Sequence, residues 1–137
     1  MLLNIYLYMF SLLLIIKDKR FLFFKRHKED VTYASYWGLP GGTVEEGETP
    51  VEGLIREIDE ELGMVITEFT LLNRYDRKDG KVFNVYYLNS PDFDETQIRL
   101  NFEHTEFKYF TYQEILNSKD FIPDTMEFIN DYIRTTV

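Results

Sequence analysis

The sequence has no cysteine, only four prolines and only seven glycines among its 137 residues. Without cysteine the chain can form no disulfide, thiolate metal site or cysteine nucleophile. No repeat, low-complexity tract or Pro/Gly/Ser-rich linker interrupts it, so nothing marks a boundary between two domains. We therefore expect one domain spanning residues 1–137, large enough for a single hydrophobic core.

Basic side chains are also in short supply, with 15 Lys and Arg against 24 Asp and Glu, and the net charge is −9. This balance disfavours broad non-specific binding to nucleic acid. We therefore expect a small-molecule partner rather than a nucleic acid. The lack of cysteine is compatible with a reducing compartment, and we expect a cytoplasmic location. The sequence leaves the oligomeric state open, a homodimer included.

The most apolar segment, residues 1–16, is short for a membrane span. It also has no basic residue before it and no small-residue cleavage site. Ser11–Ile16 and Phe21–Phe24, separated by the polar Lys17–Arg20, are more typical of two strands joined by a turn. We predict these two strands and no membrane partner; a membrane contact through residues 1–10 is the alternative.

Residues 49–63 carry the signals of a helix and of both its ends. Thr49 and Glu52 form a T-x-x-E capping box, and Pro50 occupies the first helical position. Gly63 suits the left-handed conformation that ends many helices. Apolar residues recur at helical spacing, namely Val51, Leu54, Ile55, Ile58 and Leu62. We predict a helix from Thr49 to Leu62 with one face toward a core.

The same helix would place Glu57, Glu60 and Glu61 on one side, because residues three and four apart are neighbours on a helix. Three uncompensated carboxylates repel one another, and the usual remedy is a hard divalent cation such as Mg²⁺. Glutamate is common on solvated helix faces. Such a face, however, does not need Gly42 and Glu48 at fixed distances upstream. The joint pattern therefore favours a metal site.

Further elements follow from local patterns. Strands are predicted at Ile66–Tyr75 and Val82–Leu88 around a turn at Arg77–Lys81, which contains the Asp-Gly hairpin signal. Glu106–Phe110 alternates as a half-buried strand does. Capping boxes that begin at Thr111 and Asp124 predict a short helix and a final helix. Strands and helices mixed in this way indicate an α+β fold or a layered αβα sandwich.

The stretch from Gly42 to Met64 resembles the Nudix box, G-x5-E-x7-R-E-U-x-E-E-x-G-U, where U is a bulky aliphatic residue. Every fixed position agrees, with Met64 a slightly soft match at the last one. Trp37–Gly42 is similar to the family's usual lead-in, and Phe102–Phe110 to a later strand that often supplies another acidic residue. The resemblance extends from Ser11 onward. It implies an α+β fold of the Nudix type, an αβα sandwich with a mixed sheet between helices.

The resemblance also implies roles for the box residues. Glu57 and Glu61 would be metal ligands, and Glu60 a third ligand or a base that orients water. The Gly41 carbonyl is a further ligand candidate, because glycine allows the backbone to approach a metal closely. Arg56 would hold neighbouring carboxylates in place. An ordinary surface pair between Arg56 and Glu60 is the alternative.

The general base is less defined, and our order of candidates is Glu60, Glu106, Glu103. His104 is weaker, because a lone histidine beside a strand is more often a hydrogen-bonded surface residue.

Substrate contacts are predicted by position in the family plan. Lys25 and Arg26 end the second strand, where the family often places a phosphate-binding cation; a solvated strand end is equally consistent. Leu39 precedes the glycine pair and could contact a base. For Trp37, burial in the core is the better interpretation.

The implied activity is a Mg²⁺-dependent pyrophosphohydrolase, with Mn²⁺ as a substitute, that acts on a nucleoside diphosphate linked to another group. The S-Q-P-W-P run of NADH enzymes, the proline of ADP-ribose enzymes and the tyrosine of dinucleoside polyphosphate enzymes are missing. By elimination a nucleoside triphosphate is favoured, while a capped RNA end or a nucleotide sugar stays open. A non-catalytic nucleotide-binding or sensor module of the same fold is the alternative. A prenyl diphosphate isomerase would need a longer chain and a catalytic cysteine.

Overall fold

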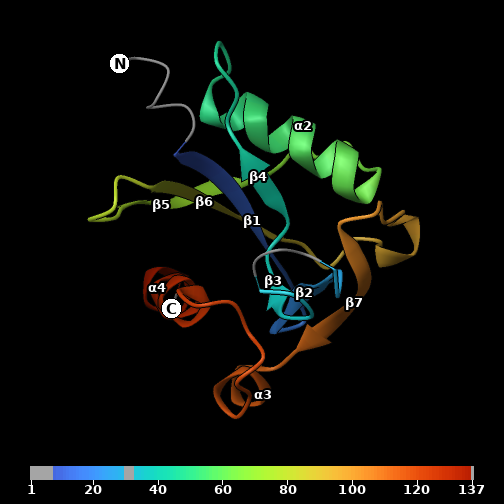
Figure 1. Ribbon diagram of the computed structural model, residues 1–137. Coiled ribbons are helices and arrows are strands. Elements are labelled where there is room, and N and C mark those ends of the chain that lie inside the picture. Colours follow the sequence, from blue (N-terminus) through green and yellow to red (C-terminus); the bar gives the residue numbers. More distant parts are fainter. Residues whose placement is uncertain (1–7, 30–32, 137) are drawn as a thin grey trace.

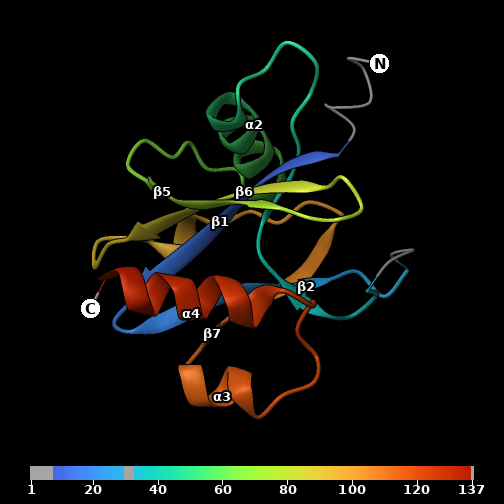
Figure 2. The same ribbon diagram turned by 90° about the vertical axis from the view of Figure 1, so that its left-hand side faces the viewer.

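A mixed β-sheet lies at the centre of the protein, with helices on both faces (Figure 1, Figure 2). The structure is a computed structural model that describes residues 8–29 and 33–136. Its elements in chain order are β1 (Met9–Lys17), β2 (Arg20–Arg26), β3 (Trp37–Gly38), β4 (Gly41–Thr43), α2 (Pro50–Leu62), β5 (Thr70–Asp76), β6 (Val82–Asn89), η1 (Glu95–Gln97), β7 (His104–Phe110), α3 (Tyr112–Leu116) and α4 (Thr125–Thr136). The predicted α+β sandwich is confirmed.

Strand β1 occupies the middle of the sheet, whose order is β3-β2-β1-β6-β5. It pairs antiparallel with β2 and β4 and parallel with β6, which makes the sheet mixed. Strand β7 pairs antiparallel with β2. Asp18 and Lys19, which connect β1 to β2, both have positive φ, as a two-residue type I′ hairpin requires. The two predicted N-terminal strands and their turn are confirmed.

Both faces of β1 and β2 are buried, which explains why their sequences are continuous apolar runs rather than alternating ones. Alternate side chains point to opposite faces of a strand. One set packs beneath α2: Leu13, Ile15, Leu22 and Phe24 with Leu54, Ile58 and Leu62. The other packs toward α3 and α4: Leu14, Ile16, Phe21 and Phe23 with Ile115, Ile129 and Tyr132. The sheet is thus covered on both sides (Figure 2).

Helix α2 begins and ends where the sequence predicts. The Thr49 Oγ1 accepts from the Glu52 N–H at 3.1 Å, and the Glu52 carboxylate accepts from the Thr49 N–H at 2.8 Å. Gly63 has φ 65° and donates its N–H to the Asp59 carbonyl at 2.9 Å. The predicted apolar face is buried at Leu54, Ile58 and Leu62, whereas Val51 at its edge is exposed. The capped ends and the buried face fix the helix against the sheet.

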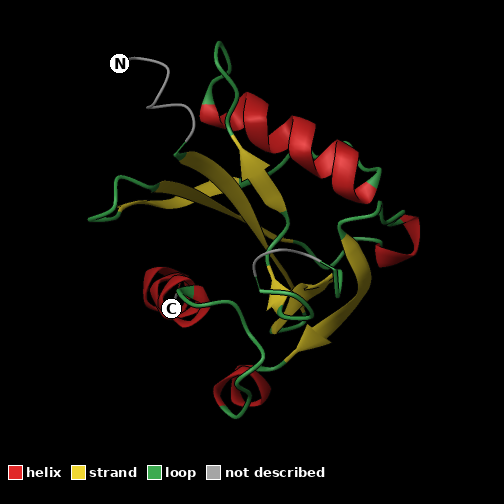
Figure 3. Cartoon of the chain, viewed as in Figure 1, coloured by secondary structure: helices red, strands yellow, loops and turns green. Residues whose placement is uncertain are grey.

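The strand predicted over Ile66–Tyr75 begins only at Thr70 (Figure 3). Ile66 is buried in the core beneath α2 although it lies in an irregular connection. The Phe69 ring meets the Tyr86 ring edge-on at 5.6 Å. The prediction of strand over residues 66–69 is therefore wrong. Their burial comes from packing against the helix and sheet, and the hairpin of β5 with β6 forms as predicted.

The two C-terminal helices are confirmed. Helix α3 carries the predicted capping box, formed by Thr111 and Glu114. Helix α4 begins directly after Asp124, whose carboxylate lies 3.4 Å from the Arg77 guanidinium in the turn between β5 and β6. The Glu127 carboxylate accepts from the same guanidinium at 2.5 Å. These contacts connect the start of α4 to that turn.

Within residues 8–29 and 33–136, no helix combines the length and apolar character needed to cross a membrane. The alternative of a membrane contact through residues 1–10 falls mostly on residues 1–7, which lie outside the described residues.

Replacing Thr49 by Ala removes one side of the capping box, which leaves the Glu52 N–H without its side-chain acceptor. We expect the free energy of unfolding to fall by about 1 kcal/mol, measured by urea denaturation. Thr67→Ala is the matched control, because Thr67 is exposed in a loop and its replacement should stay within about 0.5 kcal/mol of wild type. Equal losses for both variants would contradict a capping role.

Candidate functional site

A cleft of about 1000 Å³ lies over β4, between α2, the start of α4 and the start of β7. Three acidic side chains line it, those of Glu57, Glu61 and Glu103, together with the backbone of Gly41 and Gly42. A mainly apolar part is lined by Phe10, Leu12, Leu39, Phe83 and Phe128, and a more polar part by Arg26, His27 and Tyr33. Figure 1 shows the lower end of β4 between these surrounding elements. Side chains far apart in the sequence therefore face one space.

Glu57 enters the cleft from the middle of α2. A Cβ atom at Gly42 would lie 2.6 Å from the Glu57 carboxyl carbon and 2.7–2.8 Å from both of its oxygens. Only glycine at position 42 leaves room for the carboxylate in this place. The Arg56 Nη1 donates to the Glu57 Oε1 at 3.1 Å and so holds the same side chain. The fixed spacing between Gly42 and the glutamates thus has a steric reason, the room that Gly42 leaves for the Glu57 carboxylate.

Glu61, one turn further along α2, is the most deeply buried acidic residue of the cleft, with 1% of its surface exposed. Its Oε1 accepts from the Gly41 N–H at 3.4 Å, whereas its Oε2 has no hydrogen-bond partner among the described residues. Burial, followed by the neighbouring carboxylates of Glu57 and Glu103, raises the pKa of Glu61 well above its usual range. A buried carboxylate oxygen without a donor fits a cation ligand, because a cation would remove this penalty.

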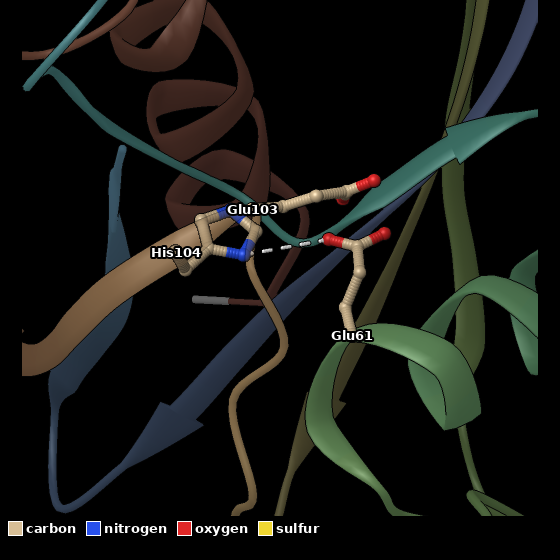
Figure 4. Close-up of side chains that lie close together, drawn as sticks. All are labelled: Glu61, Glu103 and His104. Atoms are coloured by element: carbon tan, nitrogen blue, oxygen red, sulfur yellow. Dashed lines mark ion pairs between the residues drawn. The ribbon is translucent and has the colours of Figure 1, made fainter. Parts of the chain in front are cut away.

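Glu103 and His104 meet Glu61 from the start of β7 (Figure 4). One potential ligand atom from each of the three residues lies within 4.8 Å of the other two. The His104 Nδ1 is 3.7 Å from the Glu61 Oε1. Together with Glu57, these residues supply oxygen and nitrogen atoms that can bind a divalent cation between them.

The surface location expected for His104 is wrong, because only 7% of it is exposed. Pairing of β7 with β2 places His104 opposite Arg26, and the His27 N–H donates to the Glu103 carbonyl at 3.0 Å. The His104 ring packs 5.6 Å from the Phe24 ring. Sequence reasoning missed this position because it depends on the register between two strands far apart in the chain. The sequence feature that could have indicated a shared site is the adjacent pair Glu103-His104.

Arg56 contacts four acidic side chains and one carbonyl. Its Nε and Nη2 bind the two Glu48 oxygens at 2.7 and 3.1 Å, a bidentate pair. Its Nη2 also donates to the Thr43 carbonyl in β4 at 3.0 Å. Besides Glu57, its Nη1 lies 3.3 Å from Glu60 and 3.4 Å from Glu45. The hydrogen bond from Arg56 lowers the pKa of Glu48, and Glu48 in turn raises that of Arg56. These contacts place the Arg56 guanidinium between the neighbouring carboxylates that it is predicted to hold.

Glu60 and Glu106 lie elsewhere. Successive helical residues turn by about 100°, so Glu60 and Glu61 point in different directions from α2. The Glu60 side chain is 55% exposed and faces Arg56, whereas Glu61 faces the cleft. Glu106 is exposed on β7 opposite Lys25. The structure therefore brings together Glu57, Glu61 and Glu103, and it leaves Glu60 and Glu106 outside the cleft lining.

The predicted substrate-contact residues Arg26 and Leu39 both line the cleft. Trp37 is half-buried, with its ring 4.9 Å from that of Phe110. The Lys25 ammonium lies 5.7 Å from the centre of the Trp37 ring. Phe102, which sequence reasoning did not single out as a contact, lines the cleft with 81% of its surface exposed.

The sequence of this chain is similar to a family model and to several curated relatives. A family model described as NUDIX domain matches residues 8–132. The chain is 36% identical over 104 residues to an RNA pyrophosphohydrolase of Sulfurovum sp., covering 66% of this chain and 64% of that protein. It is 30% identical over 122 residues to an ADP-ribose pyrophosphatase of Methanocaldococcus jannaschii, covering 86% and 68%.

A shorter match, 47% identical over 38 residues, relates 28% of the chain to 34% of an 8-oxo-dGTP diphosphatase of Proteus vulgaris. The chain thus spans 34% and 64% of two of the curated relatives that it matches. Among solved structures, a MutT NUDIX hydrolase from Burkholderia pseudomallei is similar with a TM-score of 0.73 and 26% identity. That match covers 90% of this chain and 95% of the other.

Replacing Arg56 by Lys keeps the charge but loses the bidentate pair with Glu48, because an ammonium has no planar fork. We expect the free energy of unfolding to fall by roughly 1–3 kcal/mol in urea denaturation. Arg74→Lys is the control, since the side chain of Arg74 forms an exposed pair with Asp76 and no other ion pair within the described part of the chain. A loss no larger than that of the control would show that Arg56 is an ordinary surface residue.

Replacing Glu61 by Gln should stabilise the protein in EDTA, increasingly so as pH rises. A carboxyl whose folded-state pKa is raised stabilises the fold fully below the unfolded pKa of about 4.5, and that contribution is lost as pH rises toward the folded value. Between pH 5 and pH 9 wild type should therefore lose stability relative to E61Q, by up to about 1.4 kcal/mol per pH unit. Thermal melts across this range test the prediction. The exposed Glu60→Gln should track wild type, and parallel curves for E61Q and wild type would contradict it.

Proposed function

This chain belongs to the NUDIX domain family, and from that membership we propose that it is a Mg²⁺-dependent pyrophosphohydrolase. It would cleave a phosphoanhydride bond in a nucleoside diphosphate linked to another group. The observation that carries the proposal is the buried Glu61 carboxylate beside Glu57 in the cleft, with an oxygen that has no donor among the described residues. Such a centre has little use in a protein that does not bind a cation.

In this proposal Glu57 and Glu61 hold the cation, and the Gly41 carbonyl is a further ligand. Magnesium is the expected ion and manganese a substitute. The bound ion supplies charge neutralisation at the phosphate oxygens and lowers the pKa of a water molecule. Arg56 is a positioning residue, because it binds Glu57 and ties β4 and Glu48 to the helix. Gly42 contributes by leaving space for Glu57.

We propose Glu103 as the general base. Glu103 lines the cleft, and its carboxylate lies within 4.8 Å of ligand atoms of both Glu61 and His104. A base must come within hydrogen-bond reach of the proton that it removes, directly or through one water. Glu60 and Glu106, which precede Glu103 in the order drawn from the sequence, lie outside the cleft lining. The tertiary arrangement thus favours the last of the three candidates.

The substrate would lie across the whole cleft. Phe10 and Phe83 stack at 5.1 Å, and Phe83 lies 6.3 Å from Phe128, which gives an apolar wall suited to a nucleobase. Leu39 lines the same part, and Arg26 in the more polar part suits a phosphate. A nucleoside triphosphate is the first candidate, in line with the name of the Proteus vulgaris relative. An RNA 5′ end, as in the name of the Sulfurovum sp. relative, and a nucleotide sugar follow.

A turnover screen in Mg²⁺ tests the proposal. The panel comprises dNTPs including oxidised dGTP, NDP-sugars, ADP-ribose, dinucleoside polyphosphates and RNA with a 5′-triphosphate or cap, with products resolved by chromatography. We expect metal-dependent release of phosphate, pyrophosphate or a nucleoside monophosphate from at least one of these. Nucleotide binding without turnover across the panel would favour a sensor module instead.

Replacing Glu103 by Gln should lower kcat by roughly 10²–10⁴-fold, the scale of general-base catalysis, on whichever substrate the screen identifies. The matched controls are Glu106→Gln, on strand β7 just after Glu103, and Glu60→Gln, on the same helix as Glu61. Both should retain kcat within a few-fold of wild type, because neither lines the cleft. A large loss in a control and a small one in E103Q would transfer the role to that residue.

A further inference from the structure

The distance between His104 and Glu61 suits two ligands of one ion. The His104 Nδ1 and the Glu61 Oε1 are 3.7 Å apart, too far for a hydrogen bond. Ligand atoms about 2.1 Å from one cation lie roughly 3 Å apart in an octahedral shell and slightly more in a tetrahedral one. A small adjustment of either side chain brings these two atoms to that spacing. In Figure 4 the nitrogen of the imidazole points at the Glu61 carboxylate.

The His104 side chain and the backbone that carries Glu61 are held by their surroundings. His104 packs against Phe24 and pairs with Arg26 across the β2–β7 ladder. The segment before it is tied to the end of α2, because the Arg99 N–H donates to the Leu62 carbonyl at 2.8 Å and the Asn101 N–H to the Glu61 carbonyl at 3.2 Å. A donor set that is fixed before the ion arrives loses little conformational entropy on binding.

We propose that His104 is a nitrogen ligand, through Nδ1, of the cation that Glu61 holds. The inference rests on the proposed function for the presence of that cation, and it extends the site from oxygen donors to a mixed set. Magnesium prefers oxygen and gains little from imidazole, whereas Mn²⁺ and the later first-row ions accept imidazole readily. The site therefore binds Mn²⁺ more tightly than Mg²⁺, and His104 accounts for the difference. Glu103 remains the base.

Pulsed electron paramagnetic resonance of Mn²⁺ bound to the full chain tests this directly. A coordinated imidazole couples its ¹⁴N nucleus to the manganese spin. The chain has only two histidines, and His27 lines the same cleft as His104. We expect the nitrogen coupling in wild type, its loss in His104→Gln and its retention in the matched control His27→Gln. Wild-type protein labelled with [¹⁵N]histidine should show the ¹⁵N pattern instead, a test that needs no substitution.

Calorimetry gives the second readout. H104Q should weaken Mn²⁺ binding by about tenfold or more, the scale of substitutions at metal sites, with a far smaller effect on Mg²⁺. Absence of nitrogen coupling in wild type, its persistence in H104Q, its loss in H27Q, or equal losses of Mn²⁺ and Mg²⁺ affinity would each overturn the proposal. Turnover is measured separately. A wild type that hydrolyses nothing in the panel would refute the proposed function, while the resonance spectrum would still decide the ligand.

Discussion

The burial of one carboxylate, that of Glu61, is the constraint on which the site depends. Its side chain is enclosed by α2, β4 and β7, and its hydrogen-bonded oxygen has a long contact with the Gly41 N–H. An ionised carboxylate in such a place is costly for the metal-free protein, and the same burial raises the pKa of Glu61. The surrounding architecture must therefore be stable enough to hold it there, and the proposed cation would make the position favourable.

That stability comes from the opposite side of the same helix. Leu54, Ile58 and Leu62 are fully buried against the sheet, and capping at both ends fixes where α2 begins and stops. Burying each such side chain stabilises the fold by about 2 kcal/mol. The apolar face thus determines the rotation of the helix, and that rotation determines that Glu57 and Glu61 enter the cleft while the half-exposed Glu60 lies beside Arg56.

Arg56 reduces the repulsion among the acidic side chains beside the cleft. With a net charge of −9, the chain concentrates acidic groups beside a cleft proposed for an anionic substrate. The guanidinium neutralises part of this charge within the protein by its bidentate pair with Glu48 and its bond to Glu57. It also joins α2 to β4 through the Thr43 carbonyl. The same side chain therefore orients a carboxylate and fixes the distance between helix and strand.

Local chemistry in the sequence determined the helix and its ends, because a capping box, a first-turn proline and a left-handed glycine act over a few residues. It also determined the N-terminal hairpin and the two C-terminal helices, for the same reason. The tertiary structure alone decided which glutamates share the cleft and that His104 is buried beside them. Helical spacing gives the angles between side chains around the helix axis, but only packing against the sheet decides which of these side chains point into the cleft. The approach of Glu103 and His104 to Glu61 depends on the register of β7 against β2, strands about 80 residues apart, and no local pattern encodes a pairing of that range.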